Sequence, residues 1–402
     1  MKLLGDFIEN IEKKSVNINL DNLLIGYNNI RNHIIKVDNN KQVEYVIDKK
    51  CDHAGGKLIL KGNEAVCPLH GWKLNLNSLI YNDSHVSKKQ KDFTLNDNSS
   101  ITIEDEKINL VNPFLNERKN SSLKFTWINH ACVYIEYNGI SIITDPWIFG
   151  PAFLTGWWLS SPSAKEGIEL INKADYIYIS HNHPDHLHSE TLSLVEKNKK
   201  FIVANFKSKS AELFLNSLGF NNIIVADFKK IFELEGGLQF SIFKSGDFRD
   251  DSGIYLNGGG NQMLLTVDSN FLNSNILPSN IDVLMTSFAA GASGFPLSYN
   301  NYDDKEKKLI LERNIMAIRS LVSEYIKSTK PKYYFPYAGM FVEKSPRDFY
   351  VKENNLKNSI IDINDFLSRS ESEFIYPDKN INYKLINNHL LKDDNSYTFL
   401  PE

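Results

Sequence analysis

The sequence predicts two domains of different class, an all-β domain over residues 40–115 followed by an α/β sandwich over residues 122–402. Residues 40–111 contain short strand-like runs that are separated by Gly, Asn and Asp. From residue 123 onward, helical patterns alternate with strands. The polar, turn-rich segment 112–122 is the expected linker, and residues 1–39 are treated as an N-terminal extension.

Length, composition and charge limit the number of domains, the partners and the cellular location that can be expected. A chain of 402 residues with 42% hydrophobic content can build two or three domains with their own cores. Its net charge of −4 gives no reason to expect a nucleic-acid partner. No apolar run approaches the ~18 residues of a membrane span, and the N-terminus lacks the features of a signal peptide. Three cysteines do not make a disulfide framework, so a reducing cytoplasmic location is expected.

In the second domain, the elements follow in a regular order. Strands are expected at 123–128, 132–137 and 140–144, with Asn138-Gly139 as a hairpin turn. Helices are expected at 164–174, 189–198 and 208–219, and each is followed by a strand. A long helix is predicted over 304–328, before a strand at 332–336. The clustering of strands favours a sandwich over a doubly wound sheet.

The first candidate site combines Cys51-x-His53 with Cys67-x-x-His70, and thirteen residues separate the two pairs. Two thiolates and two imidazoles suit either a structural zinc or a 2Fe–2S Rieske cluster. Each loop here contains one Cys and one His. This favours the cluster, because zinc fingers usually pair Cys with Cys and His with His. The stretch resembles the Rieske family, in which the cysteines bind one iron and the histidines the other. Such a cluster relays single electrons, so a second redox centre is expected.

The second candidate site is the run His181-x-His183-x-Asp185-His186, which follows a predicted strand. Imidazoles two residues apart, with a carboxylate and another imidazole directly after them, make a compact metal site on a strand-to-helix loop. His188 extends the run and is expected beside the site or in solvent. His130 precedes a strand and could line the site, although a packed histidine is the expectation.

This run resembles the H-x-H-x-D-H signature of the metallo-β-lactamase superfamily, which implies an αββα sandwich. The resemblance makes His181, His183, Asp185 and His186 metal-binding and catalytic residues, and Asp268 a bridging ligand. It gives Asp145 the place of an early structural aspartate. The stretch where the family has a third histidine reads FKSGDFRDDSG, without histidine. By position Asp247 fills the slot, although Asp250 or Asp251 could serve instead or the slot could be empty. Two histidines and one carboxylate are typical of mononuclear Fe(II) sites that activate oxygen.

Both sites together resemble one family, the CMP-N-acetylneuraminate monooxygenases. The resemblance rests on HGWKL, TDPWIFGPAF, YISHNHPDHL, TVDS, FAAGASGFPLSY and PYAGMFVEKSP. It implies hydroxylation of the N-acetyl group of CMP-sialic acid to N-glycolyl, with molecular oxygen. It also implies a Rieske cluster, one or two Fe(II) ions in the second domain with zinc as the alternative, and an electron donor such as a b-type cytochrome or ferredoxin with its reductase. The oligomeric state does not follow from the sequence.

Several residues are candidates for substrate binding. The aromatic run around Trp157 and Trp158 is expected to form either a wall for a base or sugar, or core. The glycine-rich stretch with Gly291 and Ser293 follows a predicted strand and is expected to line a pocket, and Tyr337 follows another strand. The glycines at 258–260 are expected to form a plain turn.

Three functions compete at this point. The leading hypothesis is an iron monooxygenase, acting on a nucleotide sugar or on another amide or amine. The second is a metallo-β-lactamase-fold hydrolase that keeps the Rieske module as a redox sensor. The third is a non-enzymatic electron carrier. The missing histidines disfavour the second, and the complete H-x-H-x-D-H run disfavours the third.

Overall fold

The computed structural model describes residues 1–52, 56–68, 71–82, 84–96, 99–115, 118, 121–368, 370–394 and 397–400, apart from the side chain of Ser293. Two compact units are present: a smaller unit, Glu9–Asn109, and a larger unit that joins Met1–Ile8 to Leu110–Glu402. These boundaries differ from the predicted ones at residues 40 and 115. The first 39 residues form no separate extension, because they supply strands to both units.

The described part of the smaller unit consists of strands and one 3-10 turn, η1 (Leu20–Asn22). Three small antiparallel sheets have the orders β10-β11-β2, β3-β4-β5 and β6-β7-β8-β9. Their strands are β2 (Ile8–Asn19), β3 (Gly26–Ile30), β4 (His33–Val37), β5 (Val43–Asp48), β6 (Ile59–Lys61), β7 (Glu64–Val66), β8 (Lys73–Asn75), β9 (Ile80–Tyr81), β10 (Phe93–Asn96) and β11 (Ser100–Val111). Branched aliphatic side chains such as Val16, Ile35, Val46 and Ile101 form a core between the first two of these sheets.

The larger unit is built on two eight-stranded sheets. One has the order β1 (Lys2–Asp6), β19 (Lys230–Glu233), β20 (Leu238–Lys244), β21 (Ser252–Gly258), β22 (Asn261–Leu265), β23 (Val283–Thr286), β24 (Tyr333–Pro336), β26 (Glu373–Phe374). The other has the order β18 (Ile223–Ala226), β17 (Lys200–Ala204), β16 (Tyr176–Ile179), β14 (Ile140–Thr144), β13 (Cys132–Tyr137), β12 (Leu123–Asn129), β27 (Ile381–Ile386), β28 (His389–Asp394). Side chains from both sheets interlock in one hydrophobic core, which is the packing expected of a sandwich.

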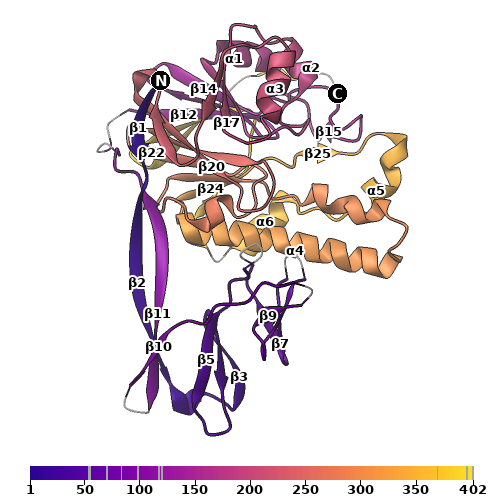
Figure 1. Cartoon of the computed structure of the whole chain (residues 1–402). Coiled ribbons are helices and arrows are strands. Elements are labelled where there is room, and N and C mark those ends of the chain that lie inside the picture. Colours follow the sequence, from indigo (N-terminus) through magenta and orange to yellow (C-terminus); the bar gives the residue numbers. More distant parts are fainter. Residues whose placement is uncertain are drawn as a thin grey trace. The chain divides into compact units, whose positions relative to one another are not determined.

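Helices cover both outer faces of this sandwich. Helices α1 (Gly167–Lys173), α2 (Ser189–Ser193) and α3 (Ser210–Ser217) bury Ile171, Leu192 and Leu215 against one sheet. The long helix α4 (Asp304–Thr329) and α6 (Ile360–Leu367) lie on the opposite side, as Figure 1 shows. The remaining elements are β15 (Trp158–Leu159), β25 (Phe341–Val342), α5 (Phe349–Asn354) and the 3-10 turns η2 (Glu235–Gly237), η3 (Leu272–Asn275), η4 (Gly291–Ser298) and η5 (Pro346–Asp348). The αββα sandwich predicted from the sequence is therefore the architecture of this unit.

Local sequence signals explain several of these boundaries. Asn138 and Gly139 both have positive φ, 49° and 77°, and they close the hairpin between β13 and β14 as predicted. Helix α4 begins after a capping box in which Asp303 and Glu306 each bond the backbone of the other, and it ends before a left-handed Lys330.

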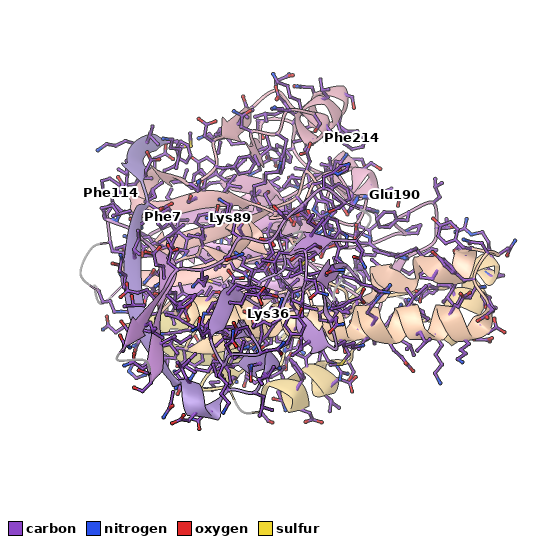
Figure 2. All side chains as sticks on the ribbon, turned by 60° about the horizontal axis from the view of Figure 1, so that its bottom comes forward. Phe7, Lys36, Lys89, Phe114, Glu190 and Phe214 are labelled. Atoms are coloured by element: carbon purple, nitrogen blue, oxygen red, sulfur yellow. The ribbon has the colours of Figure 1, made fainter. Side chains whose placement is uncertain are left out.

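The N-terminal strand joins the larger unit through both pairing and packing. β1 pairs antiparallel with β19, with Lys2 opposite Glu233. Just after β1, the Phe7 ring lies 5.4 Å from the Phe243 ring, and Gly5 approaches the Phe114 ring (Figure 2). Within the described residues, no helix has the length and apolar content needed to cross a bilayer.

Candidate metal centre

The H-x-H-x-D-H run lies at one edge of the sandwich, where several strands end. β14 and β16 are parallel neighbours, so Asp145 and His181, which follow them, come to the same edge. Asp145 is fully buried and accepts hydrogen bonds from the Ser180 backbone N–H (2.8 Å) and the Ser180 hydroxyl (2.7 Å). Asp268 follows β22 on the opposite sheet and reaches the same place.

His186 is the centre of this arrangement. Its Nδ1 lies 3.1 Å from Oδ2 of Asp145 and donates its proton there. Its Nε2 lies 3.4 Å from Oδ2 of Asp185 and 3.4 Å from Oδ2 of Asp268, and this is the nitrogen that would bear the lone pair once the ring is neutral. Burial acts to lower the pKa of His186, but the two carboxylates outweigh it and raise that pKa well above its ordinary value. A cation among these groups would replace the proton as the counter-charge.

His181 and His183 form the second half of the site. Nε2 of His181 lies 2.8 Å from Nδ1 of His183, so the two lone pairs converge. Nδ1 of His181 faces the Ser180 hydroxyl at 2.9 Å and Oδ1 of Asp251 at 3.6 Å. Burial lowers the pKa of both histidines, that of His181 well below its usual range. Both imidazoles are therefore neutral at pH 7, which is the form that binds metal.

The donor set fits a transition-metal ion. Two groups of side chains bring their donor atoms within 4.8 Å of one another: His130 with Asp185 and His186, and His181 with His186 and Asp268. Nε2 of His130 and of His186 and Oδ1 of Asp185 are buried without a hydrogen-bond partner among the described residues. Unpartnered buried polar atoms are rare in proteins, and a bound cation would satisfy two of these three, Nε2 of His186 and Oδ1 of Asp185. Imidazole and carboxylate ligands suit iron or zinc.

Asp247 lies in the predicted slot but is engaged elsewhere. Its Oδ1 accepts from the Ser245 hydroxyl (3.0 Å) and the Arg249 backbone N–H (3.1 Å). Its Oδ2 accepts from Arg249 Nε (2.9 Å) and Asn270 Nδ2 (3.0 Å). Asp247 thus anchors Arg249 in this structure, and its role as a metal ligand stays a prediction.

The two alternatives to Asp247 lie closer to the histidines. Asp251 is buried, and its Oδ1 faces Nδ1 of His181, the nitrogen that points away from His183. Burial and the neighbouring Asp268 raise the pKa of Asp251 to about 8. Asp251 is placed to orient His181 from behind, and Asp250 lines the same cavity of about 270 Å³ as both histidines.

His130 is buried, as expected, and it also lines the site, which was the less favoured alternative from the sequence. Its Nδ1 accepts a hydrogen bond from the Met340 backbone N–H at 3.2 Å, so the proton of the neutral ring is on Nε2. Nε2 lies 3.3 Å from Oδ2 of Asp185. His130 is therefore placed to donate to Asp185 rather than to bind a metal. The only signal in the sequence was a histidine beside a strand end.

A cavity of about 140 Å³ opens on the Asp185 and Asp268 side of the centre. Trp157 and Phe341 form one wall, with their rings stacked at 3.7 Å, and Gly291 lines it too.

Two other substrate-binding candidates lie elsewhere. Trp158 lines a separate cavity beside Lys344, and Tyr337 is fully buried in the hydrophobic core. Whether such a residue lines a pocket or packs in the core depends on the direction of its side chain at the strand end. The sequence patterns do not encode that direction. The side chain of Ser293 lies outside the described structure.

His188 caps a helix instead of joining the metal donors. Its Nδ1 accepts from the Thr191 backbone N–H at 3.1 Å, at the start of α2. Its Nε2 donates to the Pro151 carbonyl at 3.2 Å. Both ring nitrogens are therefore used in fixing the loop that carries the run.

In the smaller unit, the structure describes part of the first candidate site. Cys51 and Cys67 are both buried, whereas His53 and His70 lie outside the described residues. The backbone N–H of Cys51 donates to the Gly56 carbonyl at 2.7 Å, and that of Cys67 donates to the Trp72 carbonyl at 2.8 Å.

Comparison with known proteins finds a family that is similar to part of the larger unit. Residues 124–244 match the family model of the beta-lactamase superfamily domain. The matched stretch lies within the larger unit. This stretch includes β12 to β20 and therefore carries Asp145 and the whole histidine run. The superfamily resemblance inferred from the sequence is confirmed.

Curated relatives match most of the chain. Cytidine monophosphate-N-acetylneuraminic acid hydroxylase of Danio rerio is 31% identical over 340 residues, which are 80% of this chain and 58% of that protein. The hydroxylase of Xenopus laevis is also 31% identical, over 81% of this chain and 58% of its own length. That of Mus musculus is 29% identical, over 80% and 59%. These relatives confirm the resemblance to the CMP-N-acetylneuraminate monooxygenases, although the chain spans less than two thirds of their length.

Solved structures show more distant similarity. A possible metal-dependent hydrolase from Veillonella parvula is 12% identical, with a TM-score of 0.44, and covers 64% of this chain and 98% of its own. CmlA, a diiron beta-hydroxylase from Streptomyces venezuelae, is 17% identical, with a TM-score of 0.40, over 68% and 55%.

Proposed function

We propose that this chain is an iron-dependent monooxygenase that hydroxylates the N-acetyl group of CMP-N-acetylneuraminate to N-glycolyl. The observation that carries the proposal is the match of about four-fifths of the chain to hydroxylases of that name. The buried and unpartnered metal donors of the larger unit support it, because an oxygenase of this kind needs a metal site.

The reaction fixes what the protein must provide. One C–H bond of the acetyl methyl group breaks and a C–O bond forms. One oxygen atom of O₂ enters the product, and the other leaves as water after two electrons and two protons are added. The proposed 2Fe–2S cluster, held by Cys51, His53, Cys67 and His70, would pass these electrons singly from an external donor such as a b-type cytochrome or ferredoxin with its reductase.

The larger unit would hold iron through His181, His183, Asp185, His186 and Asp268, with zinc as the alternative metal. Iron bound there would supply the oxygen-activating chemistry. Asp145 holds His186 in the tautomer that leaves Nε2 free, and His130 donates toward Asp185. The stacked rings of Trp157 and Phe341 close one side of the cavity and limit the access of water to it.

Metal content and turnover test this proposal together. Protein purified without oxygen should contain three or four irons per chain, two in the cluster and one or two in the larger unit. With reductant, CMP-N-acetylneuraminate and O₂, each oxygen consumed should yield one N-glycolyl product. His70→Ala should abolish the cluster spectrum and turnover but leave the iron of the larger unit. His183→Ala should also stop turnover and lower the iron of the larger unit, while the cluster remains reducible. Zinc in the larger unit, with substrate hydrolysis in the absence of reductant, would overturn the proposal in favour of a hydrolase.

A further inference from the structure

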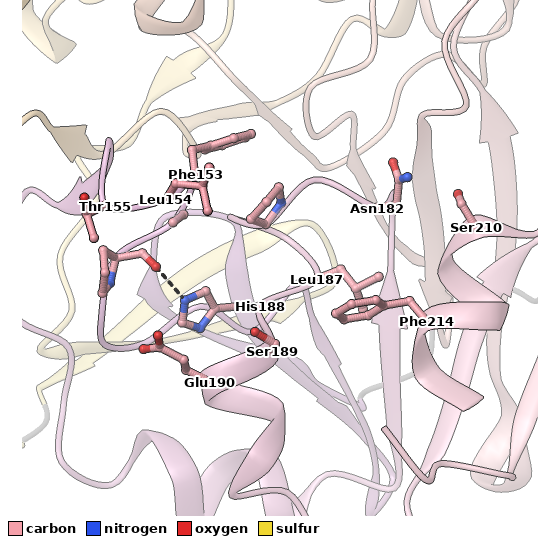
Figure 3. A pocket seen from close by; sticks show the side chains of 13 residues that line it. Phe153, Leu154, Thr155, Asn182, Leu187, His188, Ser189, Glu190, Ser210 and Phe214 are labelled. Carbon is pink, nitrogen blue, oxygen red and sulfur yellow. Dashed lines mark hydrogen bonds between the residues drawn. The ribbon is translucent and has the colours of Figure 1, made fainter. Parts of the chain in front are cut away.

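A large cavity of about 670 Å³ opens next to the loop that carries the histidine run (Figure 3). Residues 151–155 form one side, the start of α2 forms another, and Ser210 and Phe214 at α3 complete it. The cavities at the metal donors measure about 140 and 270 Å³. Ligand pockets for molecules of nucleotide size fall in the range of about 300–1,000 Å³, and of these three cavities the one of about 670 Å³ lies in that range.

The lining is suited to a neutral ring with hydrogen-bond donors. Phe153, Leu187 and Phe214 supply apolar surface, and Figure 3 shows their side chains around the hollow. Glu190 is the one acidic side chain of the lining, and neither Lys nor Arg is found among the lining residues that the structure describes. The Glu190 carboxylate has no hydrogen bond or ion pair within the described residues, and it lies on the same face as Phe214 in Figure 2. An anionic group would be repelled here, whereas an amino or hydroxyl group would find an acceptor.

The side of the cavity nearest the metal donors has an unusual backbone. Phe153, Leu154 and Thr155 have φ values of 50°, 52° and 68°, three successive left-handed residues without a glycine. Such conformations are unfavourable and are concentrated at functional sites. The turn directs the Phe153 ring between the cavity and the metal site, 4.4 Å from Trp157 and 5.9 Å from His183.

Two residues connect this cavity to the metal centre. Asn182 and Ser210 line both the large cavity and the 270 Å³ cavity that contains His181 and His183. Arg249, held by Asp247, lines that second cavity and also the 140 Å³ cavity at Asp268. The lining of the 270 Å³ cavity thus adds the guanidinium of Arg249 to the serine hydroxyls, beside the carboxyl groups of Asp250 and Asp251.

We propose that the large cavity binds the nucleoside part of the substrate. The base packs against Phe214 and Leu187 and donates an amino hydrogen to Glu190. The phosphate then lies beside the Ser210 hydroxyl and Arg249, which directs the acyl sugar toward His183. This assignment rests on the proposed function for the identity of the nucleotide, a cytidine monophosphate. The base is placed in the large cavity because its lining is largely apolar. The phosphate is placed toward the second cavity because Arg249 lines that one.

Calorimetric titration of the full-length protein with CMP, with cytidine and with N-acetylneuraminic acid tests the assignment. Glu190→Gln, which keeps the shape of the side chain, and Phe214→Ala should each weaken the binding of CMP and of cytidine by tenfold or more. Arg249→Met should weaken CMP but not cytidine. Leu213→Ala is the matched control, because Leu213 is 62% exposed on the same helix and does not line the cavity. In turnover, Glu190→Gln should raise KM and leave kcat unchanged.

The outcomes separate this assignment from the proposed function. Wild-type affinity for CMP in both Glu190→Gln and Phe214→Ala, with turnover intact, would overturn the assignment and leave the function standing. No measurable binding of CMP by the wild-type protein would also overturn it. Loss of CMP binding in both variants, in a protein that forms no N-glycolyl product, would support the cavity as a nucleotide site and overturn the function. Thermal melts of the variants show whether each remains folded.

Discussion

Nδ1 of His186 lies 3.1 Å from Oδ2 of Asp145, and both side chains are completely buried. Asp145 also accepts from the backbone and the hydroxyl of Ser180, so its carboxylate cannot turn. The imidazole is therefore held in one tautomer, with Nε2 aimed between two carboxylates. Metal-binding histidines commonly depend on such a partner.

Asp145→Asn should accordingly weaken metal binding by roughly 10- to 100-fold, the usual cost of losing such a partner. The amide nitrogen would meet donors that now face a carboxylate oxygen. The measurement is the iron retained at increasing chelator concentration. Asp175→Asn is a matched control, because Asp175 accepts in the same way from the Ser141 backbone and hydroxyl but contacts no histidine of the site. Equal iron retention in both variants would contradict this role.

His130→Gln should separate a donor from a ligand. Met340 fixes Nδ1 of His130 as an acceptor, so Nε2 carries the proton and faces Asp185. The variant should bind the same number of metal ions at saturation, with affinity or activity lower by roughly tenfold. His183→Ala, which removes a converging lone pair, should lower the stoichiometry itself. Metal titration distinguishes the two, and a lost ion in His130→Gln would make His130 a ligand.

Asp247→Ala tests the slot in which the sequence expects a third ligand. Four donors occupy the oxygens of Asp247, so we expect the metal content to be unchanged. Freed from its partner, the half-buried Arg249 should lose its position, and stability should fall by about 1–3 kcal/mol. Metal analysis and urea unfolding measure the two effects, with Asp250→Ala as the neighbouring control. Loss of one metal ion in Asp247→Ala alone would restore the facial-triad interpretation.

Features that depend on neighbouring residues could be predicted from the sequence. The Asn138-Gly139 hairpin and the long helix α4 are examples, because a turn type and a capping box are local. The histidine run was recognisable for the same reason, since the strand β16 ends just before it. Four of the donors, His181, His183, Asp185 and His186, lie within six residues of one another, whereas Asp268 comes from the opposite sheet.

Contacts between distant segments could not be predicted. His130 meets Asp185 only because β13 and β16 lie in one sheet with β14 between them, and the register of those strands decides which side chains meet. Asp251 reaches His181 from the opposite sheet.

The strand β2 was missed for another reason. Of its twelve residues only Val16 and Ile18 are buried, so it lacks the alternation that marks a strand.

Lys379 provides a test of stability against pH. Burial lowers its pKa to about 8, against about 10.4 in an unfolded chain. Between these values the unfolded chain holds a proton that the folded protein has lost, so the free energy of unfolding should rise with pH. The slope is about 1.4 kcal/mol per pH unit at most. Hydrogen bonds from Nζ to the Ser161 hydroxyl (2.8 Å) and the Pro162 carbonyl (2.7 Å) favour the ammonium and reduce the slope.

Lys379→Met isolates this effect from every other titration in the protein. Urea unfolding of both proteins at pH 7, 8, 9 and 10 should show a constant difference below pH 8. Above it, the wild type should gain stability relative to the variant, since burial then no longer opposes a charge. A difference that stays flat to pH 10 would mean that the ammonium keeps its proton when folded. The hydrogen bonds to Ser161 and Pro162 would then stabilise the ammonium by more than its loss of hydration costs. Lys379 would in that case hold the segment after β15 as a charged hydrogen-bond donor.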